Sequence, residues 1–163
     1  MKVVRRKIIF FFCAMMWLTA CSQSGQSEVN LDHYKGSSPC DPLIKSMTGI
    51  PQAPICDFIS WDLIMNRDSI NSTFQVKIIY GESQPNTPGF KVDHHIEFEG
   101  NYQVRTGVPT NPRAKLYHLK SSKDAREVWL MELDRNIFLF ADKDGKNLPG
   151  NAGYSYVLNR IKE

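Results

Sequence analysis

The sequence predicts an all-β domain, a small up-and-down barrel of about eight antiparallel strands. Apolar and polar residues alternate with a period of two over several stretches, as they do in strands that are buried on one face. Turn signals separate these stretches at short intervals, which is typical of sandwiches and barrels. Because no long amphipathic helix interrupts them, the pattern favours sequential hairpins that close into a barrel.

The first three predicted strands alternate clearly. In residues 59–66 one face carries Ile59, Trp61, Leu63 and Met65, and in residues 73–80 it carries Phe74, Val76, Ile78 and Tyr80. In residues 91–99 the apolar face carries Val92, His94, Ile96 and Phe98. The polar face of that stretch carries Lys91, Asp93, His95, Glu97 and Glu99. We expect the apolar set to line the interior and the polar set to face solvent.

The remaining strands are shorter or less regular. Gly100 breaks the third strand, and Tyr102, Val104 and Thr106 continue its alternation. Further strands are expected at residues 115–120, 127–133, 136–141 and 154–161, with turn signals between them. In residues 127–133 one face carries Trp129, Met131 and Leu133. The aromatic residues of these strands either fill the barrel or line a pocket for a small apolar ligand, and we expect them to fill it.

The first 20 residues predict a cleaved secretory leader. Four basic residues precede an apolar run, and residues 8–20 are too short for a bilayer-spanning helix, which needs about 20 residues. The sequence Leu18-Thr19-Ala20-Cys21 resembles the lipobox of bacterial lipoproteins. This resemblance implies that the leader is cut before Cys21, that the Cys21 thiol receives a diacylglycerol and that its amino group is acylated. An ordinary signal peptide with an incidental Cys21 is the alternative.

Residues 21–38 are expected to form a lipid-anchored flexible tether, because they are rich in Ser, Gln and Gly. Two or more acyl chains hold a protein stably on a membrane surface. We therefore expect the protein in the cell envelope of a Gram-negative bacterium. Ser22, rather than Asp, follows the lipobox cysteine, and in enteric bacteria this implies the outer membrane.

Residues 39–163 are expected to form the single barrel domain, with a loop-rich entry over residues 39–57 and one helical turn near Pro42–Met47. Cys40 and Cys56 lie in this entry and are an even pair in an oxidising compartment, which predicts a disulfide. Two unpaired thiols are the alternative. The chain carries a net charge of +3, but the leader holds four of its 20 basic residues and none of its 17 acidic ones. The remaining chain is slightly acidic, which excludes a basic nucleic-acid-binding domain.

Several short motifs resemble one known family. Phe98-Glu99-Gly100-Asn101-Tyr102, Asn136-Ile137-Phe138, Asp144-Gly145-Lys146 and the stretch from Tyr154 to Arg160 resemble the NlpE-like family of small bacterial lipoproteins. That family is associated with copper resistance and envelope stress sensing, and the resemblance implies a lipocalin-like barrel. The Cys-x-x-Cys of its namesake is absent, because Asp41, Pro42 and Leu43 follow Cys40. We therefore expect this chain to share the fold and the location of that family, and we do not expect it to share copper chemistry.

The sequence predicts no catalytic residue, no metal site and no cofactor. His94 and His95 are adjacent in a strand and point to opposite faces, and we expect His94 to be a core histidine and His95 to be exposed. His118 lies in another predicted strand, and clustered Met, Cys or His ligands for copper are missing. The preferred function is a non-enzymatic envelope module that senses stress or binds a protein partner. A carrier of a small apolar ligand is the alternative, and a hydrolase or inhibitor with an unrecognised site is a third class.

Overall fold

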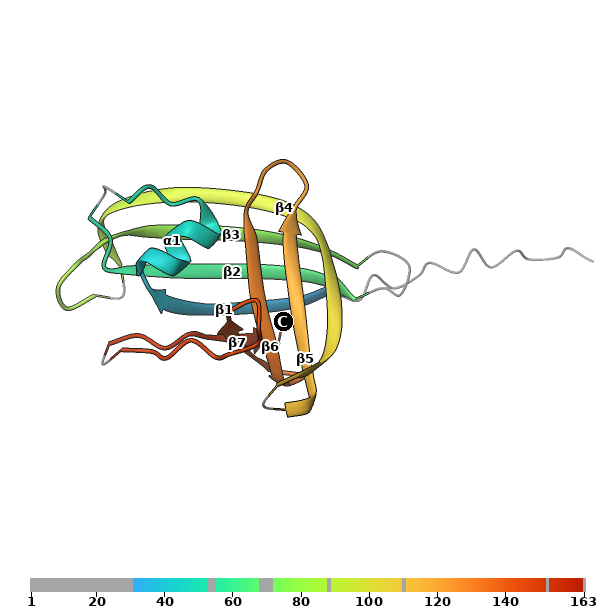
Figure 1. Cartoon of the computed structure of the whole chain (residues 1–163). Coiled ribbons are helices and arrows are strands. Elements are labelled where there is room, and N and C mark those ends of the chain that lie inside the picture. Colours follow the sequence, from blue (N-terminus) through green and yellow to red (C-terminus); the bar gives the residue numbers. More distant parts are fainter. Residues whose placement is uncertain are drawn as a thin grey trace, which may run out of the picture.

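The protein forms a closed barrel of eight antiparallel strands (Figure 1). The computed structural model describes residues 31–52, 55–67, 72–87, 89–109, 111–151 and 153–162. Each strand pairs with its neighbours in the sequence, and the last strand pairs with the first. The predicted all-β, lipocalin-like barrel is therefore confirmed, whereas the leader and Cys21 lie outside the described residues.

The strands and the helix have the following bounds: β1 Leu31–Pro39, α1 Pro42–Thr48, β2 Phe58–Arg67, β3 Ser72–Ser83, β4 Phe90–Val108, β5 Asn111–Ser121, β6 Glu127–Asp134, β7 Ile137–Ala141 and β8 Val157–Ile161. In Figure 1, β1 runs from right to left and ends close to α1. We call the end of the barrel that carries α1 the apical end. The basal end is the one at which β1 begins and β2 ends.

The first strand corrects the predicted extent of the tether. Residues 31–38 were expected to belong to it, but Leu31–Pro39 is β1, which pairs with β2 over its whole length and with β8 over five residues. Its own sequence is polar and rich in small residues, so it shows little of a strand signal. Two flanking strands supply its hydrogen-bond partners, and the buried Tyr34 anchors it in the core.

The number of strands agrees with the prediction of about eight, although β1 was not expected, because two predicted stretches form one strand. The alternating stretch around Gly100 is one continuous strand of 19 residues, β4, rather than a strand with a break. A Cβ on Gly100 would lie 2.0 Å from the carbonyl oxygen of Lys120 in β5. Gly100 therefore marks a close approach of two backbones inside the strand.

The interior of the barrel is filled by side chains from all eight strands. Trp61 of β2 and Phe140 of β7 lie on walls that are not adjacent, yet their ring centroids are 4.6 Å apart. Phe138 of β7 likewise contacts Tyr34 at 4.8 Å and Tyr117 at 4.9 Å. The Trp61 indole donates a 2.8 Å hydrogen bond to the buried Ser38 hydroxyl. Rings that meet across the barrel leave its centre packed rather than open.

The helix α1 closes the apical end. Asp41 caps it by accepting a 2.8 Å hydrogen bond from the Ile44 amide, and Gly49 ends it in the left-handed conformation. Ile44 and Met47 point into the barrel core. The predicted helical turn is therefore confirmed. In the described ranges, no helix has the length and apolar character needed to cross a membrane.

Two predictions about strand faces are wrong: that Val92 and His94 line the interior, and that Trp129 is among the aromatic residues that fill it. His94 shares the interior phase with Phe98 and Ile96, but it is exposed, as is Val92, because this part of β4 extends beyond the apolar core. In β6 the interior face carries Val128, Leu130 and Glu132.

The other face of β6, with Trp129, Met131 and Leu133, is the outer wall. Trp129 and Met131 pack there against a small second apolar cluster that includes Leu116.

Candidate functional site

The predicted disulfide is present. Cys40 and Cys56 are bonded, and their Cα atoms are 5.7 Å apart, which lies inside the usual range for a disulfide. The bond joins the two ends of the segment that contains α1. The phenol of Tyr156 donates a short hydrogen bond to the Asp41 carboxylate beside it. The disulfide therefore closes the segment around α1, and the contact between Tyr156 and Asp41 attaches this segment to the chain just before β8.

The predicted histidines do not form one site. The His94 and Tyr80 rings are tilted against each other with centroids 5.2 Å apart, and His95 contacts Asp93 at 3.1 Å on the other face. His118 stacks on Trp129, with centroids 3.8 Å apart, and its Nε2 lies 2.8 Å from Glu127. Within the described part of the chain, no group of three or more His, Cys, Asp or Glu side chains is arranged to hold a metal ion.

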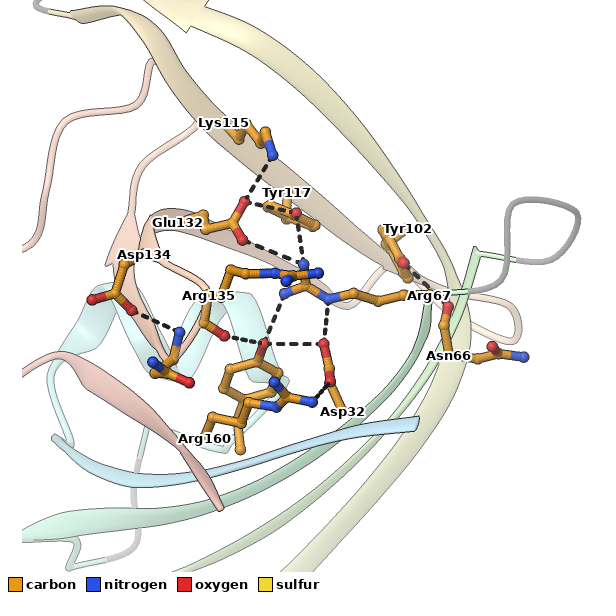
Figure 2. A network of polar contacts seen from close by, with 12 residues as sticks. Asp32, Asn66, Arg67, Tyr102, Lys115, Tyr117, Glu132, Asp134, Arg135 and Arg160 are labelled. Atoms are coloured by element: carbon orange, nitrogen blue, oxygen red, sulfur yellow. Dashed lines mark hydrogen bonds and ion pairs between the residues drawn. The ribbon is translucent and has the colours of Figure 1, made fainter. Parts of the chain in front are cut away.

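The basal end of the barrel holds a network of charged and phenolic side chains (Figure 2). Its centre is Arg67, the last residue of β2, whose side chain is 20% exposed. Two nearly buried carboxylates face it from separate strands, Asp32 of β1 at 6% and Glu132 of β6 at 7% exposure. Three tyrosines lie near them: Tyr34 of β1, which contacts Arg67, and Tyr102 of β4 and Tyr117 of β5, which Figure 2 labels.

The geometry ties three other strands, β1, β5 and β6, to the guanidinium of Arg67 in β2. Arg67 Nη2 donates to the Tyr34 hydroxyl at 2.7 Å, and Nη1 lies 3.3 Å from Glu132 and 3.4 Å from the Tyr117 hydroxyl. Nε lies 2.6 Å from Asp32 Oδ2 in an ion pair, although its N–H is not aligned for a hydrogen bond.

The carboxylates of the network have further partners. Asp32 also pairs with Arg160 of β8, and Glu132 lies 3.5 Å from Lys115 and accepts a 2.9 Å hydrogen bond from Tyr117.

Burial and charge oppose each other in this network. Burial raises the pKa of the Tyr117 phenol, and the nearby Glu132 adds to this, whereas the Arg67 charge acts in the opposite direction. The pKa of Tyr34 and that of Tyr102 are raised chiefly by burial as well. Burial alone would lower the pKa of Arg67, but Tyr117, Tyr34 and Asp32 raise it overall. Arg67 therefore stays charged, and the phenols stay protonated at neutral pH.

The arrangement is suited to closing the barrel. The charged groups point toward one another, and the Arg67 guanidinium lies 5.5 to 6.0 Å from the ring centres of Tyr34, Tyr117 and Phe138. Mutual pairing of this kind compensates the desolvation of each group. We assign the network a structural role in joining the basal ends of the strands.

Sequence reasoning missed this network. The available signal was an Arg in phase with apolar residues, since Arg67 follows Met65 and Leu63 on the interior face of β2. Glu132 is likewise in phase with Leu130. Asp32 had no such signal, because its segment was assigned to the tether.

Grooves on the described surface open on the outer wall of the barrel. One groove, of about 470 Å³, lies at the basal end and is lined by Leu31, His33, Ile64, Arg160, Ile161 and Lys162. A second groove of about 290 Å³ lies over β4 and β5, lined by Asn101, Gln103, His118, Lys120, Ser121 and Ser122. Except for the buried Ser121 and for Arg160, which also pairs with the buried Asp32, these residues face outward, so a binding partner would contact the wall rather than the interior.

Comparison with known proteins adds no relative: the chain matches no protein-family model, no curated protein and no solved structure.

Proposed function

We propose that this protein is a lipid-anchored, non-enzymatic lipoprotein of the bacterial cell envelope that binds a protein partner, as a sensor of envelope stress does. The lipobox-like sequence before Cys21 and the resemblance to envelope lipoproteins support the location. The packed interior supports a role at the surface. Because ring contacts such as Trp61 with Phe140 span the barrel, a carrier of a small apolar ligand is disfavoured.

The apical end offers a surface for such a partner. Three exposed apolar side chains come from three segments there: Leu43 of α1 at 44%, Ile55 at 71% and Val92 of β4 at 56% exposure. We call Leu43, Ile55 and Val92 the apical patch. The disulfide holds the first two segments together. Asp57 accepts hydrogen bonds of 2.8 and 2.9 Å from Ser83 of β3, the strand that pairs with β4.

Exposed apolar side chains that gather at one end of a protein are typical of interaction sites. Leu43 lies on α1 and Val92 on β4, whereas Ile55 lies in the loop next to the disulfide. A partner that docks on the apical patch would bury these three side chains.

The lipid anchor is tested in cells of a Gram-negative host. The full chain is labelled metabolically with an alkyne fatty acid and partitioned in detergent. We expect label on the wild-type protein in the detergent phase, and loss of both label and processing in Cys21→Ser. A protein that stays unlabelled and partitions into water would contradict the anchor.

The partner is tested by photo-crosslinking from the apical patch. A photoreactive amino acid at position 55 should yield a specific protein adduct in the envelope. The same residue at position 133 serves as a matched control, because Leu133 is 62% exposed on the outer wall. Ile55→Asp should abolish the partner interaction and leave the folded barrel intact. Equal adducts from both positions, or stoichiometric binding of an apolar fluorophore in the interior, would overturn the proposal.

A further inference from the structure

The basal groove combines an apolar floor with a cationic rim. Leu31, Ile64 and Ile161 form its apolar part, from β1, β2 and β8. In the strand register His33 lies between Ile64 and Ile161, so the three strands present one continuous strip. Leu31 is 55% and Ile161 36% exposed, and both line the same groove.

The exposed charged side chains at the basal groove are mainly cationic. Lys162 is exposed and makes no ion pair with another described residue. Arg160 pairs with Asp32 through one nitrogen, yet a third of its side chain stays exposed. Asp32 itself is 6% exposed and lies between Arg160 and Arg67. The nearby Asp62 is paired with His33 at 2.7 Å and with Lys35 at 3.2 Å.

The length of the chain before the barrel favours one orientation. Leu31 begins β1 and also lines the groove. Only nine residues separate it from Cys21, so the two residues are at most about 35 Å apart. The barrel is roughly 30 Å long along its axis, given the rise per strand residue and the usual strand tilt. If the apical end faced the membrane instead, these nine residues would have to be almost fully extended along the barrel to reach Leu31.

We propose that the basal groove is a membrane-contact site that binds anionic phospholipid headgroups in the leaflet holding the acyl chains. This inference rests on the proposed lipid anchor. Arg160 and Lys162 supply donors for a lipid phosphate. Leu31, Ile64 and Ile161 supply apolar side chains that partition into the interface, as they do on interfacial helices. The barrel then stands with its basal end on the membrane and its apical patch directed away from it.

The test uses the full lipidated chain, reconstituted in phosphatidylcholine vesicles with or without phosphatidylglycerol. A fluorophore is attached beside the groove through Asn159→Cys, two residues before Ile161 on β8, or at the apical end through Gln84→Cys, both exposed positions. A lipid spin-labelled on its headgroup serves as the quencher. We expect strong quenching at position 159 and weak quenching at position 84. The basal quenching should require phosphatidylglycerol and weaken as salt is added.

Charge reversal separates headgroup binding from simple tethering. Lys162→Glu should reduce the quenching at position 159 several-fold. Lys146→Glu, in the exposed turn after β7, is the matched control and should leave it unchanged. The side chains of Lys162 and Lys146 are exposed and form no ion pair with another described residue, so neither change should unfold the protein.

Each outcome decides one of the two proposals. Equal quenching at both ends, or basal quenching that ignores phosphatidylglycerol and Lys162→Glu, would overturn the groove inference and leave the anchor standing. A wild-type chain that fails to sediment with any vesicle would overturn the anchor and the inference that rests on it.

Discussion

Phe98 packs inside the barrel, while its neighbour Glu97 points into solvent. Phe98 is 7% exposed and meets Phe74 edge-on at 5.9 Å, whereas the Glu97 side chain is 67% exposed. We expect Phe98→Ala to lower the free energy of unfolding by about 3 to 5 kcal/mol, through lost burial and a cavity. Glu97→Ala should change it by no more than about 0.5 kcal/mol.

Urea unfolding of both variants checks this assignment. A silent Phe98→Ala together with a destabilising Glu97→Ala would mean that the register of β4 is off by one residue. Two silent variants would mean that Phe98 lines an open cavity, and the ligand-carrier function would then replace the sensor.

The basal tyrosines predict a loss of stability at alkaline pH. Burial raises the pKa of Tyr117, Tyr34 and Tyr102 above the ordinary value of 10.0. Below that pH both the folded and the unfolded chain keep these protons, so the contribution to stability is fully present. As the pH rises above 10.0, the unfolded chain loses its phenol protons before the folded chain does. The free energy of unfolding therefore decreases over the pH range between the ordinary pKa and the raised pKa of the folded state.

Tyrosinate absorbance and urea unfolding, each measured as a function of pH, test this behaviour. Tyr117→Phe should flatten the alkaline fall in stability, since it removes the phenol that Arg67 and Glu132 contact. If the wild-type tyrosines all titrate at the ordinary value while the barrel stays folded, the described burial of the network is wrong.

At the scale of elements, Gly36 controls the closure between β1 and β8. A Cβ at this position would lie 2.1 Å from the Val157 carbonyl oxygen and 3.0 Å from the Leu158 side chain. Because the clash is with backbone, it cannot be relieved by a rotamer change. We expect Gly36→Ala to cost about 1 to 3 kcal/mol. Ser37→Ala, at the next residue on the outer face, should stay within about 0.5 kcal/mol.

Thermal unfolding of these two variants distinguishes a strand from a tether. A tether would tolerate both changes equally. A selective effect of Gly36→Ala is expected only if β1 closes the barrel against β8.

At the scale of the whole molecule, the disulfide lowers the conformational entropy of the unfolded chain and so stabilises the folded protein. Cys40 and Cys56 are 16 residues apart, and closing a loop of this length contributes about 3 kcal/mol in the chain-entropy model. The Cys40→Ser/Cys56→Ser double variant should unfold at correspondingly lower urea. Reductant should destabilise the wild-type protein and leave the double variant unchanged. Equal stability of the two proteins without reductant would contradict this prediction.

The two ends of the molecule have different chemistry. The apical end carries α1, the disulfide and the apical patch. The basal end carries the Arg67 network inside and the cationic groove outside. The proposals assign the apical end to a protein partner and the basal end to the membrane, and the packed barrel serves as a rigid spacer between them.

Much of the fold was predictable because period-two alternation is a local property. It identified β2, β3 and the central part of β4. The Cys40–Cys56 bond was predicted because an even pair of cysteines is expected to be oxidised in an exported protein. The basal network was not predictable. Its members come from strands far apart in the sequence, and Asp32 belongs to a segment without a strand pattern.

The sequence by itself determined the fold class, the alternation of faces and the pairing of the two cysteines. The tertiary structure decided which face is inside, where the barrel ends and that Leu31–Pro39 is a strand. Alternation shows that the two faces of a strand differ, but both faces of β6 carry apolar residues, so only packing assigns Leu130 to the core and Trp129 to the wall. A strand such as β1, with little propensity of its own, forms because β2 and β8 both satisfy its backbone.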